Sequence, residues 1–212
     1  MKNFFLIITG VLVVIAVIIT NAADNKLSLD LSFDVGNYAS DFELMGVDDR
    51  MVSLKDYASS KGFVVIFTCN TCPFAKMYEQ RIIELHRFSQ NKGFQVIAIN
   101  SNDIKKQPGD SMEKMKERAK SKGYKFPYLR DDTQEVAKAY EATKTPHTFV
   151  LSKEDPNKYK IEFIGAIDNN PRDENNVSET YVEDAINAIL EGKKPTKTKA
   201  RAVGCSIKWT DT

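Results

Sequence analysis

Two cysteines that stand three positions apart, Cys69 and Cys72, are the residues of this 212-residue chain best suited to chemistry. They lie in the stretch VVIFTCNTCPF, after an apolar run that is typical of a strand buried on both faces. Pro73 follows them and suits the first position of a helix, where its missing N–H is not needed. A thiolate is the reactive form of cysteine, and a helix N-terminus favours its negative charge. This placement predicts a dithiol–disulfide pair, with Cys69 as the acidified attacking thiol and Cys72 as the resolving thiol.

Two other interpretations of the cysteine pair stay open. A zinc half-site would need two further ligands from among Cys205, His86 and His147. Two inert, buried thiols would need no partner. A structural disulfide is disfavoured, because so short a loop constrains the unfolded chain little. The redox interpretation leads, because C-x-x-C between a buried strand and a helix is a fairly specific signal.

The flanking sequence predicts a βαβ unit around the cysteines. Apolar residues recur at helical spacing from Pro73 to Phe88, and FQVIAIN at residues 94–100 is strand-like. The cysteines therefore belong at the carboxyl end of the first strand of the unit. Elsewhere the sequence predicts a hairpin with its turn near residues 48–49, a polar loop at 102–111, helices at 112–122, 134–142 and 180–191, and strands within KFPYLRD, TPHTFVLS and YKIEFIGAID.

Composition favours one α/β domain, residues 23–192, with a basic tail at 193–212. A content of 42% hydrophobic and 28% charged residues is ordinary for a globular domain. A formal net charge of +1 gives no reason to expect a nucleic-acid partner. The tail contains Cys205, which is a second resolving thiol, an intermolecular linkage, or a residue packed with Ile207 and Trp209.

The N-terminal segment predicts export. Lys2 precedes an apolar run at residues 4–20, and small residues follow it in TNAAD. This pattern is typical of a signal peptide, residues 1–22, cleaved after Ala22. The run is also close to the length of a membrane span, so an uncleaved inner-membrane anchor is the alternative. Either interpretation places the remaining chain outside the cytoplasm, in the periplasm or secreted.

Motifs outside the cysteine pair resemble a known superfamily. KTPHTFV, together with the cysteine pair upstream, resembles the thioredoxin superfamily. The opening YASDFELMGVDDRMVSLKDY, the later FPYLRDDTQEVAKAYEATKTP and the terminal GCSIKW are similar to its redoxin branch, the alkyl hydroperoxide reductase/thiol-specific antioxidant family. Within that branch they resemble a peroxiredoxin-like subgroup, and the resemblance covers about residues 34–209.

The resemblance implies a thioredoxin-like α/β fold, with a central mixed sheet flanked by helices and an N-terminal β extension. It implies a cis peptide bond between Thr145 and Pro146, with the Thr145 backbone binding an extended substrate beside Cys69. Thr68 stands where thioredoxin has its tryptophan and would also contact substrate. No cofactor is implied beyond the redox-active disulfide. The implied partners are protein or small-molecule disulfides and an electron-donor or electron-acceptor protein.

Departures from the family patterns leave the reaction open. The peroxiredoxin motif P-x-x-x-T-x-x-C fails when it is aligned on Cys72, because Val65 and Cys69 replace its proline and threonine. Aligned on Cys69, it meets Gly62 and Ile66. The leading function is therefore thiol–disulfide exchange, with a thiol peroxidase as the alternative. The dipeptide between the cysteines, Asn-Thr, differs from that of thioredoxin, so the sequence predicts no redox direction.

The two histidines keep a further alternative open. His147 follows Pro146 directly and would either stabilise a thiolate at Cys69 or point into solvent from a strand entry. Two thiolates and one imidazole suit copper, so a copper-binding or partner-binding redoxin without turnover is a third candidate. Copper-handling relatives space their cysteines one residue wider, which favours exchange. His86 is expected to be structural or solvent-facing.

Overall fold

The computed structural model describes residues 33–211. The predicted signal peptide or anchor, residues 1–22, lies outside the described residues. No helix within residues 33–211 is long and apolar enough to span a bilayer.

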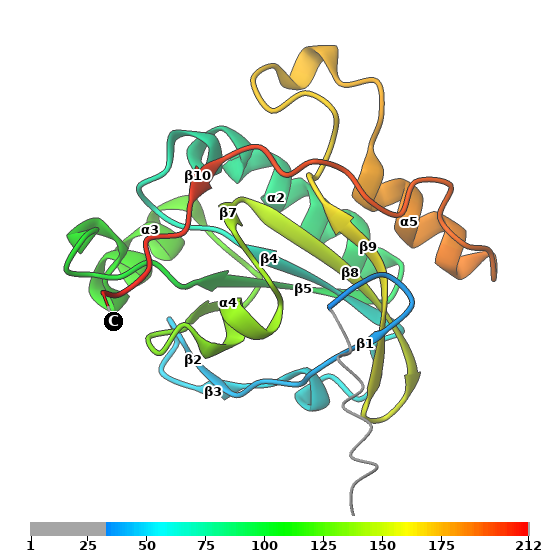
Figure 1. Cartoon of the computed structure of the whole chain (residues 1–212), viewed down its shortest axis with the longest axis horizontal. Helices are drawn as coiled ribbons and strands as arrows, with labels where there is room; N and C mark the ends of the chain where they lie inside the picture. The colour runs from blue at the N-terminus through cyan, green and yellow to red at the C-terminus, as the bar shows by residue number, and fades with distance from the viewer. Residues whose placement is uncertain (1–32, 212) are drawn as a thin grey trace, which may run out of the picture. The chain divides into compact units, whose positions relative to one another are not determined.

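An eight-stranded mixed sheet forms the centre of the described chain (Figure 1), with the strand order β1-β9-β8-β4-β5-β6-β2-β3. β4, β5 and β6 pair in parallel, and the remaining neighbours are antiparallel. The strands are β1 (Tyr38–Ala39), β2 (Leu44–Gly46), β3 (Met51–Val52), β4 (Gly62–Phe67), β5 (Phe94–Asn100), β6 (Tyr128–Arg130), β8 (His147–Asp155) and β9 (Lys158–Gly165). The predicted mixed sheet and N-terminal hairpin are confirmed.

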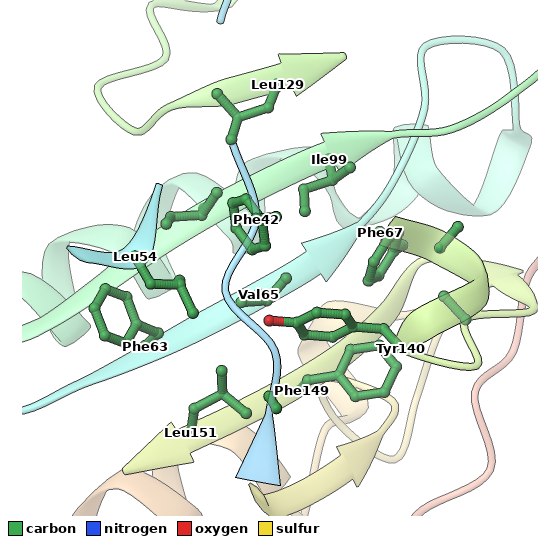
Figure 2. Close-up of a cluster of buried hydrophobic side chains, with 14 of the residues drawn as sticks. Phe42, Leu54, Phe63, Val65, Phe67, Ile99, Leu129, Tyr140, Phe149 and Leu151 are labelled. Carbon is green, nitrogen blue, oxygen red and sulfur yellow. The ribbon is translucent and has the colours of Figure 1, made fainter. Parts of the chain in front are cut away.

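β4 lies in the middle of this sheet, and every one of its residues is buried. Successive side chains of a strand point to opposite faces. Phe63, Val65 and Phe67 accordingly join one hydrophobic core, where they pack with side chains such as Tyr140 and Phe149 (Figure 2). Val64 and Ile66 join a second core beneath the helices. Burial on both faces explains why β4 is apolar throughout.

The helices are α2 (Pro73–Asn91), α3 (Met112–Lys122), α4 (Glu135–Ala139) and α5 (Tyr181–Leu190), with short 3-10 turns at Leu54–Asp56, Pro108–Asp110 and Glu174–Asn176. α2, α3 and α5 all contribute side chains to the second core, including Tyr78, Met115 and Val182. Their apolar residues follow the helical spacing seen in the sequence, and the three predicted helices are confirmed.

The helix predicted at residues 134–142 is shorter than expected. Gln134 has a left-handed backbone, with φ of 62°, so the helix begins at Glu135, and it ends at Ala139, shortly before Glu141, whose φ is 48°. The buried side-chain amide of Gln134 donates hydrogen bonds to the carbonyl oxygens of Ser101 and Lys208, at 2.6 and 2.8 Å. These long-range contacts hold Gln134 outside the helix, and local sequence does not reveal them.

The C-terminal segment crosses back over the domain and adds a separate two-stranded sheet. β10 (Cys205–Ser206) pairs antiparallel with β7 (Lys144–Thr145). Figure 1 shows β10 beside β7. Upstream of β10, the Ala200 N–H donates to Ile164 O at 3.0 Å, so the segment also pairs with the edge of β9.

Candidate active site

The cysteine pair lies between the end of β4 and the start of α2, as the sequence predicts. Cys72 is the N-cap residue of α2, with an extended backbone (φ −67°, ψ 127°), and Pro73 takes the first helical position. The first hydrogen bond of the helix runs from the Lys76 N–H to Cys72 O at 3.0 Å. The thiol that sits directly at the helix N-terminus is therefore that of Cys72.

Both thiols of the pair are buried, each residue being only 4% exposed. The Cys72 N–H donates to Cys69 Sγ at 3.3 Å, which ties the two residues together. The Cys69 thiol donates to the Thr145 hydroxyl at 3.5 Å, and the Cys72 thiol donates to Thr145 O at 3.2 Å. Thr145 thus contacts both sulfur atoms, and its peptide bond to Pro146 is cis, as predicted.

The third cysteine joins the same cluster from the far end of the chain. Cys205 packs with Cys69 and Cys72, and its N–H donates to Cys72 Sγ at 3.3 Å. In the pairing of β10 with β7, Cys205 lies opposite Thr145. Among the three cysteines, Cys205 alone is partly exposed rather than buried, and all three are free thiols.

The three thiols differ in pKa because their surroundings differ. Interaction with the neighbouring Cys69 side chain lowers the pKa of Cys72 to about 4, against the effect of burial, and contacts with Cys205 and the Ala75 N–H lower it further. The hydrogen bond to Cys72 raises the pKa of Cys69, and so do burial and the Asp110 carboxylate. Burial, with the neighbouring Cys72 sulfur, raises the pKa of Cys205 to about 11.

This order of acidity differs from the sequence-based expectation, in which Cys69 carries the thiolate. That expectation assumed that Cys69 stands closest to the helix start. Because α2 begins only at Pro73, the unpaired N–H groups of its first turn favour charge on Cys72 instead. The helix N-terminus thus favours negative charge on Cys72, while the Cys72 N–H that donates to Cys69 Sγ favours it on Cys69.

Asp110 supports the segment between the two cysteines, and sequence analysis missed it within the predicted polar loop at 102–111. It is fully buried at the end of the Pro108–Asp110 turn. Its carboxylate accepts hydrogen bonds from the Asn70 N–H at 2.6 Å and the Thr71 hydroxyl at 2.7 Å. The side-chain amides of Asn100 and Asn102 donate to it at 3.2 and 2.8 Å. No local pattern marks Asp110, because its partners come from two other segments of the chain, residues 70–71 and residues 100–102.

The other predicted site residues have different surroundings. Thr68 is buried, and its N–H donates to Ile99 O at 2.8 Å, extending the pairing of β4 with β5. His147 accepts the Thr143 N–H at Nδ1 over 3.3 Å and packs on Phe149, with ring centroids 4.6 Å apart. Burial lowers the pKa of His147 to about 4, so its imidazole is neutral near pH 7. These contacts link His147 to the sheet core rather than to the thiols.

No metal cluster accompanies the cysteines in the part of the chain that is described. Within residues 33–211, no three His, Cys, Asp or Glu side chains are arranged to hold an ion. The combination of Cys69, Cys72 and His147 proposed for copper is therefore not assembled. His86 is buried on α2 and packs against Phe126, with ring centroids 5.6 Å apart, which supports a structural role.

The sequence matches the family model described as the AhpC/TSA family over residues 35–158. Among curated proteins, the chain is similar to a protein named thiol-disulfide oxidoreductase ResA from Geobacillus thermodenitrificans (strain NG80-2). The two are 30% identical over 119 residues, which is 56% of this chain and 64% of that protein. The chain thus spans less than two thirds of the length of this curated relative.

Two crystal structures resemble the chain over most of its length. One is a protein from Geobacillus kaustophilus, 38% identical, with a TM-score of 0.78 over 85% of this chain and 94% of that one. The other is from Sinorhizobium meliloti 1021, 32% identical, with a TM-score of 0.77 over 84% and 96%. A peroxidoxin, BcpB from Mycobacterium tuberculosis, shares the fold at 16% identity and a TM-score of 0.50 over 75% and 94%. The thioredoxin-like α/β fold predicted from the sequence is confirmed.

Proposed function

The chain belongs to the AhpC/TSA family, and on that premise we propose that it is a thiol–disulfide oxidoreductase acting through Cys69 and Cys72. The observation that carries the proposal is the shared contact of both sulfur atoms with Thr145, at the junction of a buried strand and a helix N-terminus. The similarity to the ResA protein supports the same class of reaction.

The electrostatics of the pair give each thiol a role. The Cys72 thiolate attacks one sulfur of a substrate disulfide, forming a mixed disulfide and releasing the other substrate sulfur as a thiolate, which takes up a proton. Cys69 then loses its proton and attacks Cys72 Sγ. The Cys69–Cys72 disulfide forms, and the second substrate thiol leaves reduced. Two electrons pass to the substrate, and the reverse sequence oxidises a dithiol.

Residues around the pair would position the substrate. We assign Thr145 and Pro146 to binding of an extended peptide at the edge of β7, with Thr68 lining the site behind the cysteines. The reaction needs no cofactor besides the cysteine disulfide itself. It needs a dithiol donor or a disulfide acceptor, which we expect to be a protein, and we expect no nucleic-acid partner.

Disulfide exchange is tested by incubating the purified protein with a protein disulfide, such as that of insulin, and dithiothreitol. Replacing Cys72 with serine is expected to abolish catalysed reduction, whereas Cys69→Ser is expected to accumulate the mixed disulfide on Cys72. Equal rates for the wild type and Cys72→Ser would refute the proposal. Stable mixed disulfides in Cys72→Ser, and none in Cys69→Ser, would reverse the roles of the two cysteines.

The same preparations distinguish the peroxidase alternative. Val65, which stands where a peroxiredoxin has its proline, is fully buried in the sheet core and cannot shape a peroxide pocket. We therefore expect hydrogen peroxide to oxidise the pair no faster than it oxidises an ordinary thiolate. Rapid, saturable peroxide consumption with slow insulin reduction would favour the peroxidase.

Export is proposed from the N-terminal segment alone. The apolar run at residues 4–20 and the small residues after it fit a signal peptide or an inner-membrane anchor, and the proposed location is the periplasm or the cell exterior. Fractionation of expressing cells, with N-terminal sequencing of the product, tests both points. Cytoplasmic accumulation of the full chain would contradict export.

A further inference from the structure

The C-terminal segment occupies the edge of β7 that the proposed function assigns to substrate. Cys205 and Ser206 pair antiparallel with Thr145 and Lys144. The Ile207 N–H extends this pairing to Thr143 O at 3.1 Å, and the Thr145 hydroxyl approaches Cys205 O at 3.5 Å. Addition of an extended strand to a free sheet edge is a general mode of peptide recognition. The chain therefore presents its own cysteine where a substrate peptide would lie.

The segment around Cys205 is shaped for this position. A Cβ atom on Gly204 would lie 2.1 Å from Thr145 O, so only glycine allows the backbone to approach so closely. On the other side of Cys205, Ile207 is 3% exposed and belongs to the first hydrophobic core. Lys208 is anchored at both its backbone atoms, because its N–H donates to Asn102 Oδ1 and its carbonyl oxygen accepts the Asp103 N–H and the Gln134 amide. These contacts fix the register of Cys205 against the cysteine pair.

The docked segment also controls which sulfur is accessible. Cys69 and Cys72 are each 4% exposed, so a protein-sized dithiol cannot reach either of them while β10 is paired. Cys205 is partly exposed and its N–H contacts Cys72 Sγ. Electrons from a donor dithiol at the protein surface would therefore reach the buried pair through Cys205.

We propose that Cys205 is a third redox cysteine, which exchanges with the Cys69–Cys72 disulfide and carries the oxidised state to a donor dithiol at the surface. This inference rests on the proposed function, because it takes the oxidised pair as its starting point. It assigns β10 a role as an internal substrate strand, which external peptides must displace from β7.

The exchange is balanced at each step. Cys205 loses its proton to solvent and attacks Cys72 Sγ. The Cys72–Cys205 bond forms, the Cys69–Cys72 bond breaks, and the released Cys69 thiolate takes up a proton. One thiol of the donor then attacks Cys205 Sγ and releases Cys72 as a thiolate. The second donor thiol closes the donor disulfide and frees Cys205, so that two electrons enter the protein.

The charges of the cluster suit this order of events. While the pair is reduced, the neighbouring Cys72 sulfur contributes to raising the pKa of Cys205, which keeps Cys205 protonated. That contribution disappears when Cys72 enters a disulfide. When the donor attacks Cys205 Sγ, the acidic Cys72 thiol is a good leaving group, because low-pKa thiols leave faster.

The first test maps disulfides in the Cys69→Ser variant after mild oxidation with diamide, by acid quenching, alkylation and peptide mass spectrometry. The proposal expects a monomer with one Cys72–Cys205 disulfide. Covalent dimers, or monomers with free thiols at both positions, would overturn it. The matched variant Cys72→Ser is expected to form little Cys69–Cys205 disulfide, and formation to the same extent would overturn the assignment of Cys72 as the exchange partner of Cys205.

The second test measures re-reduction of the oxidised protein by reduced thioredoxin, used as a protein-sized dithiol. Cys205→Ser is expected to slow re-reduction about tenfold or more, because only the buried pair remains as a target. Ser59→Ala, at an exposed position outside β7 and β10, keeps all three thiols; it is the control and is expected to match the wild type. If Cys205→Ser is re-reduced as fast as the wild type, the relay is wrong while the proposed function stands. If the wild-type pair neither oxidises nor re-reduces, the proposed function itself fails.

A third variant separates docking of the strand from the chemistry of its thiol. Gly204→Ala keeps every cysteine but places a methyl group against Thr145 O. We expect β10 to leave β7, so that alkylation of Cys72 by iodoacetamide becomes about tenfold faster or more. An unchanged alkylation rate, with the variant folded as judged by circular dichroism, would refute the occlusion of the pair by β10.

Discussion

The two ends of the CNTC segment lie in different surroundings. At the Cys69 end, the residues that follow it, Asn70 and Thr71, donate hydrogen bonds to the buried Asp110 carboxylate. At the other end, Cys72 is the N-cap of α2 and accepts the Cys205 N–H. The hydrogen bond between the two thiols, with burial and the Asp110 carboxylate, raises the pKa of Cys69; the same hydrogen bond, with contacts from Cys205 and the Ala75 N–H, lowers that of Cys72. Two identical side chains three positions apart thus differ through their mutual contact and through groups from other segments, and the motif alone shows neither.

The largest effect is expected from removing the Asp110 carboxylate, the group that distinguishes the Cys69 end of the segment. Asp110→Ala leaves four hydrogen-bond donors without an acceptor in a fully buried site. We expect the free energy of unfolding to fall by about 3 kcal/mol or more, measured by urea denaturation of the reduced protein. The exposed Glu113→Gln on α3 is the control, with an expected change within about 0.5 kcal/mol. A loss below about 1 kcal/mol for Asp110→Ala would show that the carboxylate does not hold the CNTC segment.

A pH titration of the thiolate absorbance measures which of the two thiols, Cys69 or Cys72, has the lower pKa. Because the pKa of Cys72 is lowered to about 4, its thiolate is present above that value and is lost only as the pH falls towards it. At about pH 6 we expect a thiolate signal in the wild type that disappears in Cys72→Ser. The pKa of Cys69 is raised, so Cys69→Ser should retain a thiolate, although its midpoint should move upward because the hydrogen bond from Cys69 is lost.

The opposite result of this titration is equally specific. A thiolate that vanishes in Cys69→Ser and persists in Cys72→Ser would place the acidic thiol at the first position. It would mean that the helix N-terminus acts on Cys69 more strongly than on the N-cap residue.

His147 is the position at which the smallest effect is expected. Its imidazole contacts Thr143 and Phe149 rather than the cysteines, and burial keeps it neutral near pH 7. His147→Asn retains an acceptor for the Thr143 N–H, so we expect the rate of insulin reduction to change less than about twofold. A loss of about tenfold or more, without loss of stability, would place His147 in the site and revive the role considered from the sequence.

Part of the site was predictable because it is local. The buried strand, the two cysteines and the helix-starting Pro73 follow each other in sequence, so apolar pattern and helix signals place them correctly. The hairpin at residues 48–49 and the helix at Met112–Lys122 were predictable for the same reason. The position of Thr145 and Pro146 came instead from family resemblance, since a proline before a strand does not by itself reveal what it faces.

The elements that failed prediction are those that long-range contacts determine. The helix expected at residues 134–142 starts late because Gln134 bonds to carbonyl oxygens 33 and 74 residues away. Asp110 lies in a segment that reads only as polar, yet it accepts hydrogen bonds from Asn70, 40 residues earlier. Such partners leave no periodic trace in the sequence around them.

The amino-acid sequence by itself determined an α/β domain and the strand–cysteine–helix unit, because short-range periodicity and helix signals encode them, while the thioredoxin-like fold was implied by family resemblance. Only the tertiary structure decided what surrounds each thiol of the pair and which sulfur is exposed. The first depends on where the helix begins and on a carboxylate from another segment. The second depends on β10, which brings Cys205 across 133 residues to Cys72, since Gly204 allows the close approach to β7 and buried Ile207 anchors the strand.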